Sequence, residues 1–210
     1  MADYTCCLTT YPPRANNVPE VLNMMRKQTC PPARFILTLA RQDEHLRELV
    51  AGMPDVHVHI VEQDTGVWKK WMPATKLLSA NDLVFTLDDD RLLPPHAVAE
   101  FMDVLAYDPQ RPVSGNHYWH NGLKCHCGAC SLIRPRYYAG WENYYELWRS
   151  VQSSDIFYTM LAANNHFTYS QTQTDWTKAG TPFNEGVSYS RKGMVQASYE
   201  QLARIFGWIK

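Results

Sequence analysis

The sequence predicts an α/β fold with a mostly parallel central sheet and helices on both faces. Four short segments rich in β-branched and aromatic residues are typical of buried strands: residues 3–10, 34–39, 56–61 and 83–87. A segment of helical character separates each from the next, and this alternation favours parallel strands joined by right-handed crossovers. The 210 residues contain no internal repeat, low-complexity tract or linker, so we expect a single domain over residues 1–210.

Local signals place the helices of the first half. Asn17 is suited to cap a helix with Pro19 in its first turn. One apolar stripe then recurs at helical spacing: Val18, Val21, Leu22 and Met25. We expect two further helical segments, over residues 42–50 and 74–80.

The second half has fewer regular patterns. We expect a helix after Pro95, a strand over residues 112–118 and irregular structure over 119–150. Two later helices follow. One spans residues 154–164, with Asp155 in the first turn where the helix dipole favours a carboxylate, and the other spans 195–208.

The predicted strand 83–87 ends in three adjacent carboxylates, Asp88, Asp89 and Asp90. Such neighbours raise each other's pKa unless a cation lies beside them. Carboxylate oxygens suit Mg²⁺ or Mn²⁺, which also bind substrate phosphates, and ligands of open α/β sheets bind at the carboxyl ends of strands. We interpret the triplet as a metal–diphosphate site rather than a solvated acidic turn.

The overall charge excludes some partners. Lys and Arg number 20 against 21 Asp and Glu, so no general field favours nucleic acid or an anionic membrane. No apolar run approaches the length of a membrane span, and the N-terminus lacks a signal peptide's pattern. We therefore expect a cytoplasmic protein with six reduced cysteines. Arg204 and Lys210 beside Phe206 and Trp208 leave open a peripheral contact with the inner membrane face.

Three segments together resemble glycosyltransferases of the GT-A fold, in the family-2-like group of small bacterial or viral enzymes that use nucleotide sugars. They are residues 8–14 with 28–32, residues 64–73 leading into 85–90, and Ser-Asp-Ile-Phe at 154–157. The resemblance implies metal-dependent transfer from a nucleotide-diphosphate sugar, a UDP-sugar in particular, to a glycan, a lipid-linked acceptor or another hydroxyl acceptor. It also implies a nucleotide-sugar-binding half over residues 1–95 and an acceptor-side half over 96–210.

The resemblance assigns roles to particular residues. It implies that Asp88 and Asp90 bind Mn²⁺ or Mg²⁺. The nucleotide sugar is expected to contact the first loop and one side of the triplet, with two lysines as further candidates for its phosphates: Thr9, Thr10, Tyr11, Arg14, Lys69, Lys70, Asp88 and Asp89. A solvated pair is the alternative for Lys69 and Lys70.

The late helix carries the expected catalytic base, Asp155. Ser154 stands where the family usually has glutamate. A carboxylate that takes the acceptor proton typically accelerates transfer by about 10²–10⁴-fold and would invert the anomeric configuration. The alternative is that Asp155 only interacts with the helix dipole.

Residues 117–130 offer a second kind of site. Cys125, Cys127 and Cys130 could bind structural Zn²⁺ together with one of three histidines, namely His117, His120 or His126. The spacing lacks the usual paired Cys-x-x-Cys hooks, so reduced cysteines near the acceptor pocket are the alternative. Several nearby aromatic residues could stack on sugars or belong to the core: Trp119, Trp141, Tyr144, Tyr145 and Trp148.

Three other functions compete with sugar transfer. A non-catalytic carbohydrate- or partner-binding module could be built on residues 117–148 and held by zinc. A metal-dependent phosphohydrolase would carry its acidic motif on the first strand, whereas here it follows the fourth. A nucleotidyltransferase also uses metal-bound acids, but the chain has no Gly-rich phosphate loop.

Overall fold

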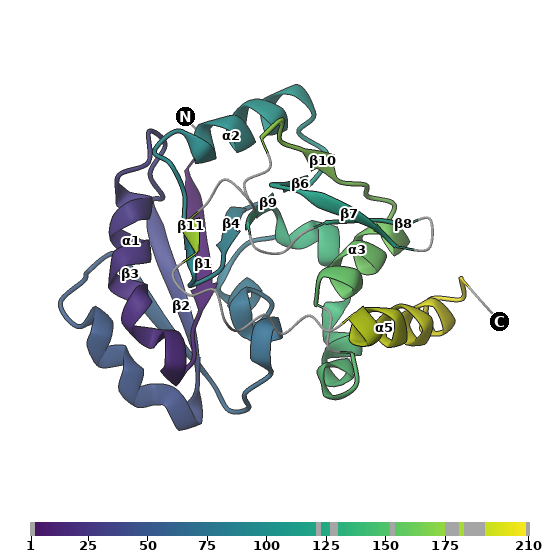
Figure 1. Ribbon diagram of the computed structural model, residues 1–210, viewed down its shortest axis with the longest axis horizontal. Coiled ribbons are helices and arrows are strands. Elements are labelled where there is room, and N and C mark those ends of the chain that lie inside the picture. The colour runs from purple at the N-terminus through teal and green to yellow at the C-terminus, as the bar shows by residue number, and fades with distance from the viewer. Residues whose placement is uncertain are drawn as a thin grey trace.

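The computed structural model describes residues 3–120, 123–126, 130–151, 154–174, 181–182 and 192–208. A seven-stranded sheet lies at its centre, in the order β10-β6-β9-β4-β1-β2-β3 (Figure 1). Its strands are β1 (Tyr4–Thr9), β2 (Arg34–Ala40), β3 (Val56–Val61), β4 (Leu83–Leu87), β6 (Val113–Ser114), β9 (Cys130–Ile133) and β10 (Ser170–Gln171). The four predicted strands of the first half are thus confirmed to within two residues.

The first four strands pair in parallel, as expected from the alternation of strands and helical segments. β1 lies between β2 and β4, and β2 pairs with β3. In the parallel register Cys7 of β1 lies opposite Thr86 of β4. The two strands therefore end at the same edge of the sheet, which brings the first loop beside the acidic triplet.

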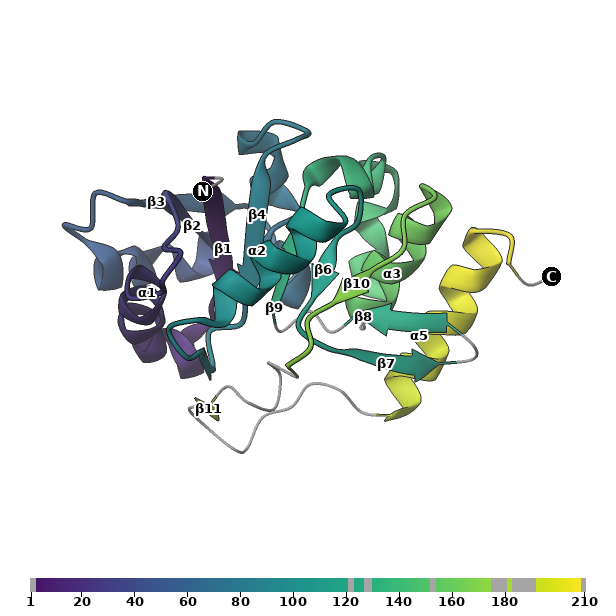
Figure 2. The same ribbon diagram turned by 90° about the horizontal axis from the view of Figure 1, so that it is seen from above.

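Side chains alternate between the two faces of the sheet. In β1, Cys6 and Leu8 belong to one core, whereas Cys7 belongs to the other. The first core is covered by α1 (Val18–Arg26) and α2 (Ala97–Tyr107). The second is covered by α3 (Ser154–Asn164) and α5 (Lys192–Ile205), which lie side by side at the end of the molecule far from α1 (Figures 1 and 2). Helices on both faces are confirmed.

Two expected helices of the first half are 3₁₀ segments, with fewer residues per turn than an α-helix: η2 (Arg41–Val50) and η4 (Pro73–Leu77). In η2 only Asp43 and Val50 are buried, so no continuous apolar stripe supports a full α-helix. A further 3₁₀ segment, η1 (Pro12–Asn17), leads directly into α1, and Asn17 makes no side-chain capping bond there.

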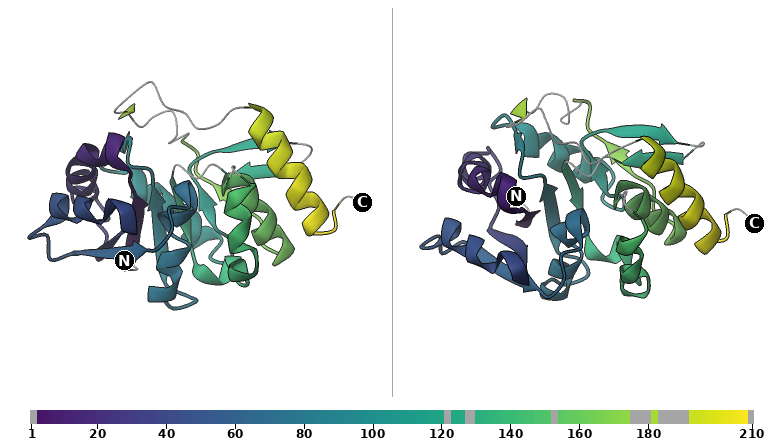
Figure 3. Two further views of the ribbon diagram at one scale, coloured as in Figure 1. Left: turned by 90° about the horizontal axis from the view of Figure 1, so that it is seen from below. Right: turned by 60° about the horizontal axis from the view of Figure 1, so that its bottom comes forward.

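The last helix differs from expectation at both ends. It begins at Lys192 and ends at Ile205 rather than spanning 195–208. Figure 3 shows it as the yellow helix beside the C-terminus. Gly207 adopts a φ of 72°, and the backbone N–H of Trp208 donates a 2.7 Å hydrogen bond to the carbonyl of Ala203. This left-handed glycine is a common way to end a helix and satisfies its last carbonyls.

The expectation of irregular structure over 119–150 is wrong. β7 (His117–His120) and β8 (Leu123–His126) form an antiparallel pair, and β9 inserts antiparallel between β4 and β6. Two 3₁₀ segments follow, η5 (Pro135–Tyr138) and η6 (Trp141–Arg149). These elements are too short to show a period in the sequence. The strand expected over 112–118 is divided between β6 and the start of β7.

Two shorter features complete the description. β5 (Arg91–Leu92) pairs antiparallel with β11 (Thr181–Pro182) directly after the acidic triplet. Within the described ranges, no helix has the length and apolar character needed to cross a membrane.

Candidate functional site at the carboxyl edge of the sheet

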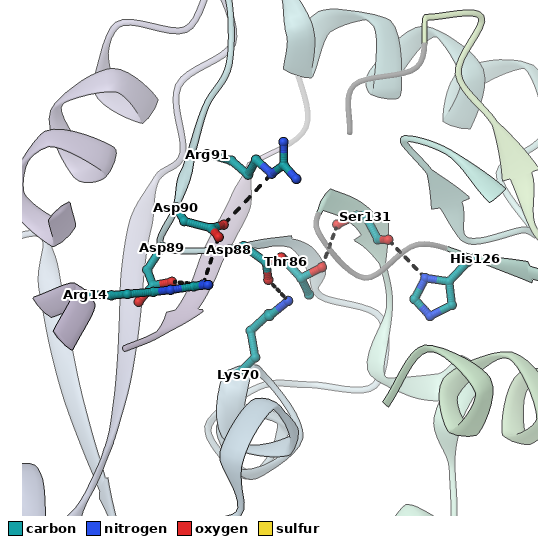
Figure 4. A network of polar contacts seen from close by, with 9 residues as sticks. All are labelled: Arg14, Lys70, Thr86, Asp88, Asp89, Asp90, Arg91, His126 and Ser131. Carbon is teal, nitrogen blue, oxygen red and sulfur yellow. Dashed lines mark hydrogen bonds and ion pairs between the residues drawn. The ribbon is translucent and has the colours of Figure 1, made fainter. Parts of the chain in front are cut away.

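Asp89 is the buried member of the acidic triplet. It is 5% exposed, and its Oδ2 accepts a 2.6 Å hydrogen bond from Thr10 Oγ1 at the end of β1 (Figure 4 shows the triplet). Burial raises the pKa of Asp89 above its usual value, although the Thr10 hydrogen bond and the charge of Arg14 act in the opposite direction. Asp89, expected to contact the nucleotide sugar, therefore ties β4 to β1 inside the protein.

Arg14 from the first loop binds the same triplet. Its Nη1 lies 2.8 Å from Asp90 Oδ2 and 3.4 Å from Asp89 Oδ1 (Figure 4). Its guanidinium lies 5.6 Å from the centre of the Tyr11 ring. Burial disfavours its charge, but Asp90 and Asp89 outweigh that effect and raise the pKa of Arg14. The residue expected at the nucleotide base is thus engaged with carboxylates.

Asp90 presents one oxygen that Arg14 does not hold. Its Oδ1 is buried and accepts no hydrogen bond from any residue in the described part of the chain. The Nε of Arg91 lies 3.9 Å from this oxygen. A buried carboxylate oxygen without a hydrogen-bond donor is a natural ligand for a hard cation.

The two lysines of η3 (Gly66–Lys70) have different partners. Lys70 Nζ forms an ion pair with Asp88 Oδ1 (Figure 4), whereas Lys69 Nζ binds Asp64 Oδ1 at 2.6 Å. Burial disfavours the Asp64 carboxylate, but the hydrogen bond and charge of Lys69 outweigh it and lower the pKa of Asp64. Of the two expected phosphate contacts, Lys70 reaches the triplet and Lys69 instead fixes the turn before η3.

Asp155 lies half-buried in the first turn of α3. Burial and the charge of Asp155 raise the pKa of the Cys125 thiol to about 12. Burial raises the pKa of Tyr158 too, and both Asp155 and Asp88 add to that shift. The charges of Asp155 on α3 and of Asp88 in the triplet therefore both act on Tyr158.

The remaining residues of the first loop make contacts beside the end of β1. Thr9 Oγ1 donates a 2.7 Å hydrogen bond to the carbonyl of Thr38, and Tyr11 supplies the ring beneath Arg14. These contacts hold the loop against β2 and the triplet.

A polar network behind the triplet was not predicted. Thr86 Oγ1 donates to the carbonyl of Ser131 at 3.4 Å, and Ser131 Oγ lies 3.3 Å from His126 Nδ1 (Figure 4). The His126 ring stacks on Tyr169 with centroids 4.3 Å apart. No sequence signal could have found it, because Thr86, His126, Ser131 and Tyr169 come together only in the folded chain.

The two described cysteines of the expected zinc set lie apart. Cys125 and Cys130 are buried thiols that pack in different core clusters, on the two faces of the sheet. Cys127 and the side chain of His120 lie outside the described residues. Among the residues that are described, no three His, Cys, Asp or Glu side chains are arranged to hold a metal ion.

The expected sugar-stacking residues that are described belong to the core. Trp141 is buried and its Nε1 donates a 3.1 Å hydrogen bond to Thr75 Oγ1. Tyr144 packs on Phe157 and Phe206. Three other side chains lie outside the description: Trp119, Tyr145 and Trp148.

Comparisons with known proteins give a result for structure but not for sequence. No family model matches the chain, and no curated protein matches its sequence. Solved structures do match. They include an S. aureus TarS fragment in complex with UDP-GlcNAc, at 14% identity and a TM-score of 0.59, covering 98% of this chain and 66% of that one. The mannosyltransferase PcManGT from Pyrobaculum calidifontis, in complex with GDP-Man and Mn²⁺, matches at 16% identity and a TM-score of 0.60 over 82% of this chain and 55% of that one.

A third similar structure has nearly this chain's length. It is the 4-diphosphocytidyl-2C-methyl-D-erythritol synthase from Anaerococcus prevotii, at 11% identity and a TM-score of 0.53 over 97% of this chain and 99% of that one. The chain spans about two thirds of the TarS fragment and about half of the mannosyltransferase. These matches show a GT-A-like glycosyltransferase fold and confirm the predicted fold class.

Proposed function

We propose that the protein is a metal-dependent glycosyltransferase that moves a sugar from a nucleotide-diphosphate sugar, in particular a UDP-sugar, to a hydroxyl acceptor. The observation that carries the proposal is the acidic triplet at the carboxyl end of β4, with a buried oxygen on Asp90 that accepts no hydrogen bond within the described ranges. The fold supports it, because the similar TarS fragment and mannosyltransferase were solved with UDP-GlcNAc and with GDP-Man and Mn²⁺.

The residues of the triplet suit a divalent ion that is bound together with its substrate. Mg²⁺ and Mn²⁺ sites of this kind use one or two carboxylates and complete their coordination with phosphate oxygens and water. Asp88 and Asp90 would hold Mn²⁺ or Mg²⁺, whose charge stabilises the leaving diphosphate. Arg14 binds Asp90 Oδ2 and so leaves Oδ1 to face the cation.

Asp155 is the proposed general base. Its carboxylate would accept the proton of the acceptor hydroxyl as the hydroxyl attacks the anomeric carbon, and direct displacement would invert the configuration. Asp155 and Asp88 both raise the pKa of Tyr158, which supports a location of Asp155 beside the donor site. Residues 1–95 would then bind the donor, whereas 96–210 would receive a glycan or lipid-linked acceptor.

The experiment is a panel of nucleotide sugars incubated with the protein and Mn²⁺, with hydrolysis and transfer measured separately. We expect release of the nucleoside diphosphate from one donor class, abolished by chelation and by Asp90→Asn. Asp103→Asn is the matched control, since Asp103 is exposed on α2, away from the triplet in sequence. Sugar binding that needs no metal would instead favour the binding module, and pyrophosphate release from nucleoside triphosphates would favour a nucleotidyltransferase.

A further inference from the structure

Lys70 is a buried lysine beside the acidic triplet. It is 6% exposed, at the end of η3, and its ammonium is ion-paired with Asp88. A buried ammonium is strongly penalised when it loses its partner. The pair will therefore persist until another anion is offered to the lysine.

Each carboxylate of the triplet lies close to a cationic side chain. Arg14 binds Asp89 and Asp90, Lys70 binds Asp88, and Arg91 lies 3.9 Å from Asp90. Three positive charges thus face three negative ones. A divalent cation approaching the protein alone meets little net attraction, and an ammonium already occupies Asp88 Oδ1.

The three contacts are not equally easy to exchange. Arg14 is fixed by two carboxylates and by the ring of Tyr11. Lys70 carries its ammonium on a flexible stem, and its partner Asp88 has the most exposed side chain of the triplet at 32%, against 6% for Asp89 and 16% for Asp90. A ligand arriving from solvent can therefore displace the Lys70–Asp88 pair before any other.

We infer that Lys70 makes metal binding depend on the donor. Without nucleotide it occupies Asp88 and keeps the divalent ion weakly bound. When a nucleoside diphosphate binds, the ammonium group of Lys70 moves from Asp88 to a phosphate oxygen. Asp88 can then bind the ion. This inference rests on the proposed function and adds to it a specific role for Lys70 as a positioning residue.

Binding of the nucleotide and binding of the metal should therefore be positively coupled, and this coupling can be measured. If nucleotide and metal both displace one pair, each must strengthen the binding of the other by the same factor. We expect that factor to lie in the usual range for coupled sites, about 5–150-fold. Removing the ammonium should tighten the binding of metal alone, since Asp88 is then vacant, and should weaken that of UDP alone.

The experiment measures Mn²⁺ affinity with and without UDP, for the wild type, Lys70→Met and Lys70→Gln. We expect Mn²⁺ alone to bind about tenfold more tightly to the variants, with the coupling to UDP reduced below about threefold. Lys76→Met is the control, because Lys76 is an exposed lysine of η4 outside the proposed donor site, and its Mn²⁺ affinity should be unchanged. Circular dichroism verifies that each variant is folded.

Different results separate the two claims. Mn²⁺ binding that is unchanged or weaker in folded Lys70 variants overturns the inference while UDP–Mn²⁺ binding by the wild type still supports the proposed function. If neither variant folds, a wild-type coupling below about threefold overturns it. Failure of the wild type to bind UDP with Mn²⁺ contradicts the proposed function itself.

Discussion

Thr10 and Asp89 are 79 positions apart in the chain, yet Thr10 Oγ1 donates a 2.6 Å hydrogen bond to Asp89 Oδ2 in the buried edge of the sheet. The contact joins the residue that follows β1 to the acidic turn after β4. Asp89 is thus tied to β1, whereas its neighbours Asp88 and Asp90 form ion pairs with Lys70 and Arg14. The geometry of the candidate site therefore depends on the hydrogen bond between Thr10 and Asp89.

Replacing Thr10 by Val should destabilise the protein. The substitution keeps the shape of the side chain but leaves a buried carboxylate without its shortest hydrogen bond, which typically costs about 1–3 kcal/mol. Urea denaturation measures the change. Thr29→Val is the control, because the Thr29 hydroxyl donates to the Pro95 carbonyl from an exposed position. Equal losses in the two variants would contradict the structural role of Thr10.

Gly115, directly after β6, packs closely against Cys130 of β9. A Cβ added there would overlap Cys130 Sγ and lie 3.0 Å from Phe101 Cζ. We expect Gly115→Ala to lower the free energy of unfolding by about 1–3 kcal/mol, as overpacking usually does. The double variant Gly115→Ala with Cys130→Ala should recover part of the loss, because removing the sulfur makes room. A double variant in which the two losses simply add would contradict this packing.

The Asp64–Lys69 pair should make stability depend on pH. The pKa of Asp64 in the folded protein is below the ordinary 3.8, so the ionised carboxylate stabilises the fold above that value. The contribution is lost as the pH falls from about 4 through the lower folded value. We expect Asp64→Asn to be less stable than the wild type by about 2 kcal/mol at pH 7, a value reduced for the partial exposure of Asp64.

Denaturation of the two proteins at pH 7 and pH 3 measures this dependence. The difference between wild type and Asp64→Asn should narrow at the lower pH. A difference that is constant across the range would show that the carboxylate charge contributes nothing.

Asp155→Asn separates the catalytic role from a purely helical one. If Asp155 accepts the acceptor proton, transfer should fall by about 10²–10⁴-fold, while the affinity for UDP and Mn²⁺ is unchanged. Steady-state transfer and calorimetry measure the two quantities. Asp103→Asn controls for loss of a carboxylate. A variant with full activity and a lower melting temperature would show that Asp155 interacts only with the helix dipole.

Much of the fold could be predicted because its signals are local. The strands β3 and β4 and the helix α3 have the predicted bounds, since each combines a clear apolar pattern with a turn or cap beside it. β9 could not be predicted in this way. Its four residues are a central strand only because β4 and β6 pair with them from distant parts of the chain.

The same distinction applies to the site. The position of the triplet followed from the end of a buried strand, and the parallel register then placed the first loop beside it. The ion-pair partners of the site residues could not be predicted from the sequence. Arg14 turned out to bind Asp89 and Asp90, and Lys69 to bind Asp64, because these contacts are set by tertiary distances that no spacing in the sequence records.

The most direct test of the whole account is calorimetric titration of UDP into the protein with and without Mn²⁺, in the wild type and in Asp90→Asn. We predict that the wild type binds UDP at least about fivefold more tightly with Mn²⁺, and that Asp90→Asn loses this gain while Asp103→Asn keeps it. Binding of UDP that is equally strong without metal, or a metal effect that survives in Asp90→Asn, would contradict a donor site built on the acidic triplet.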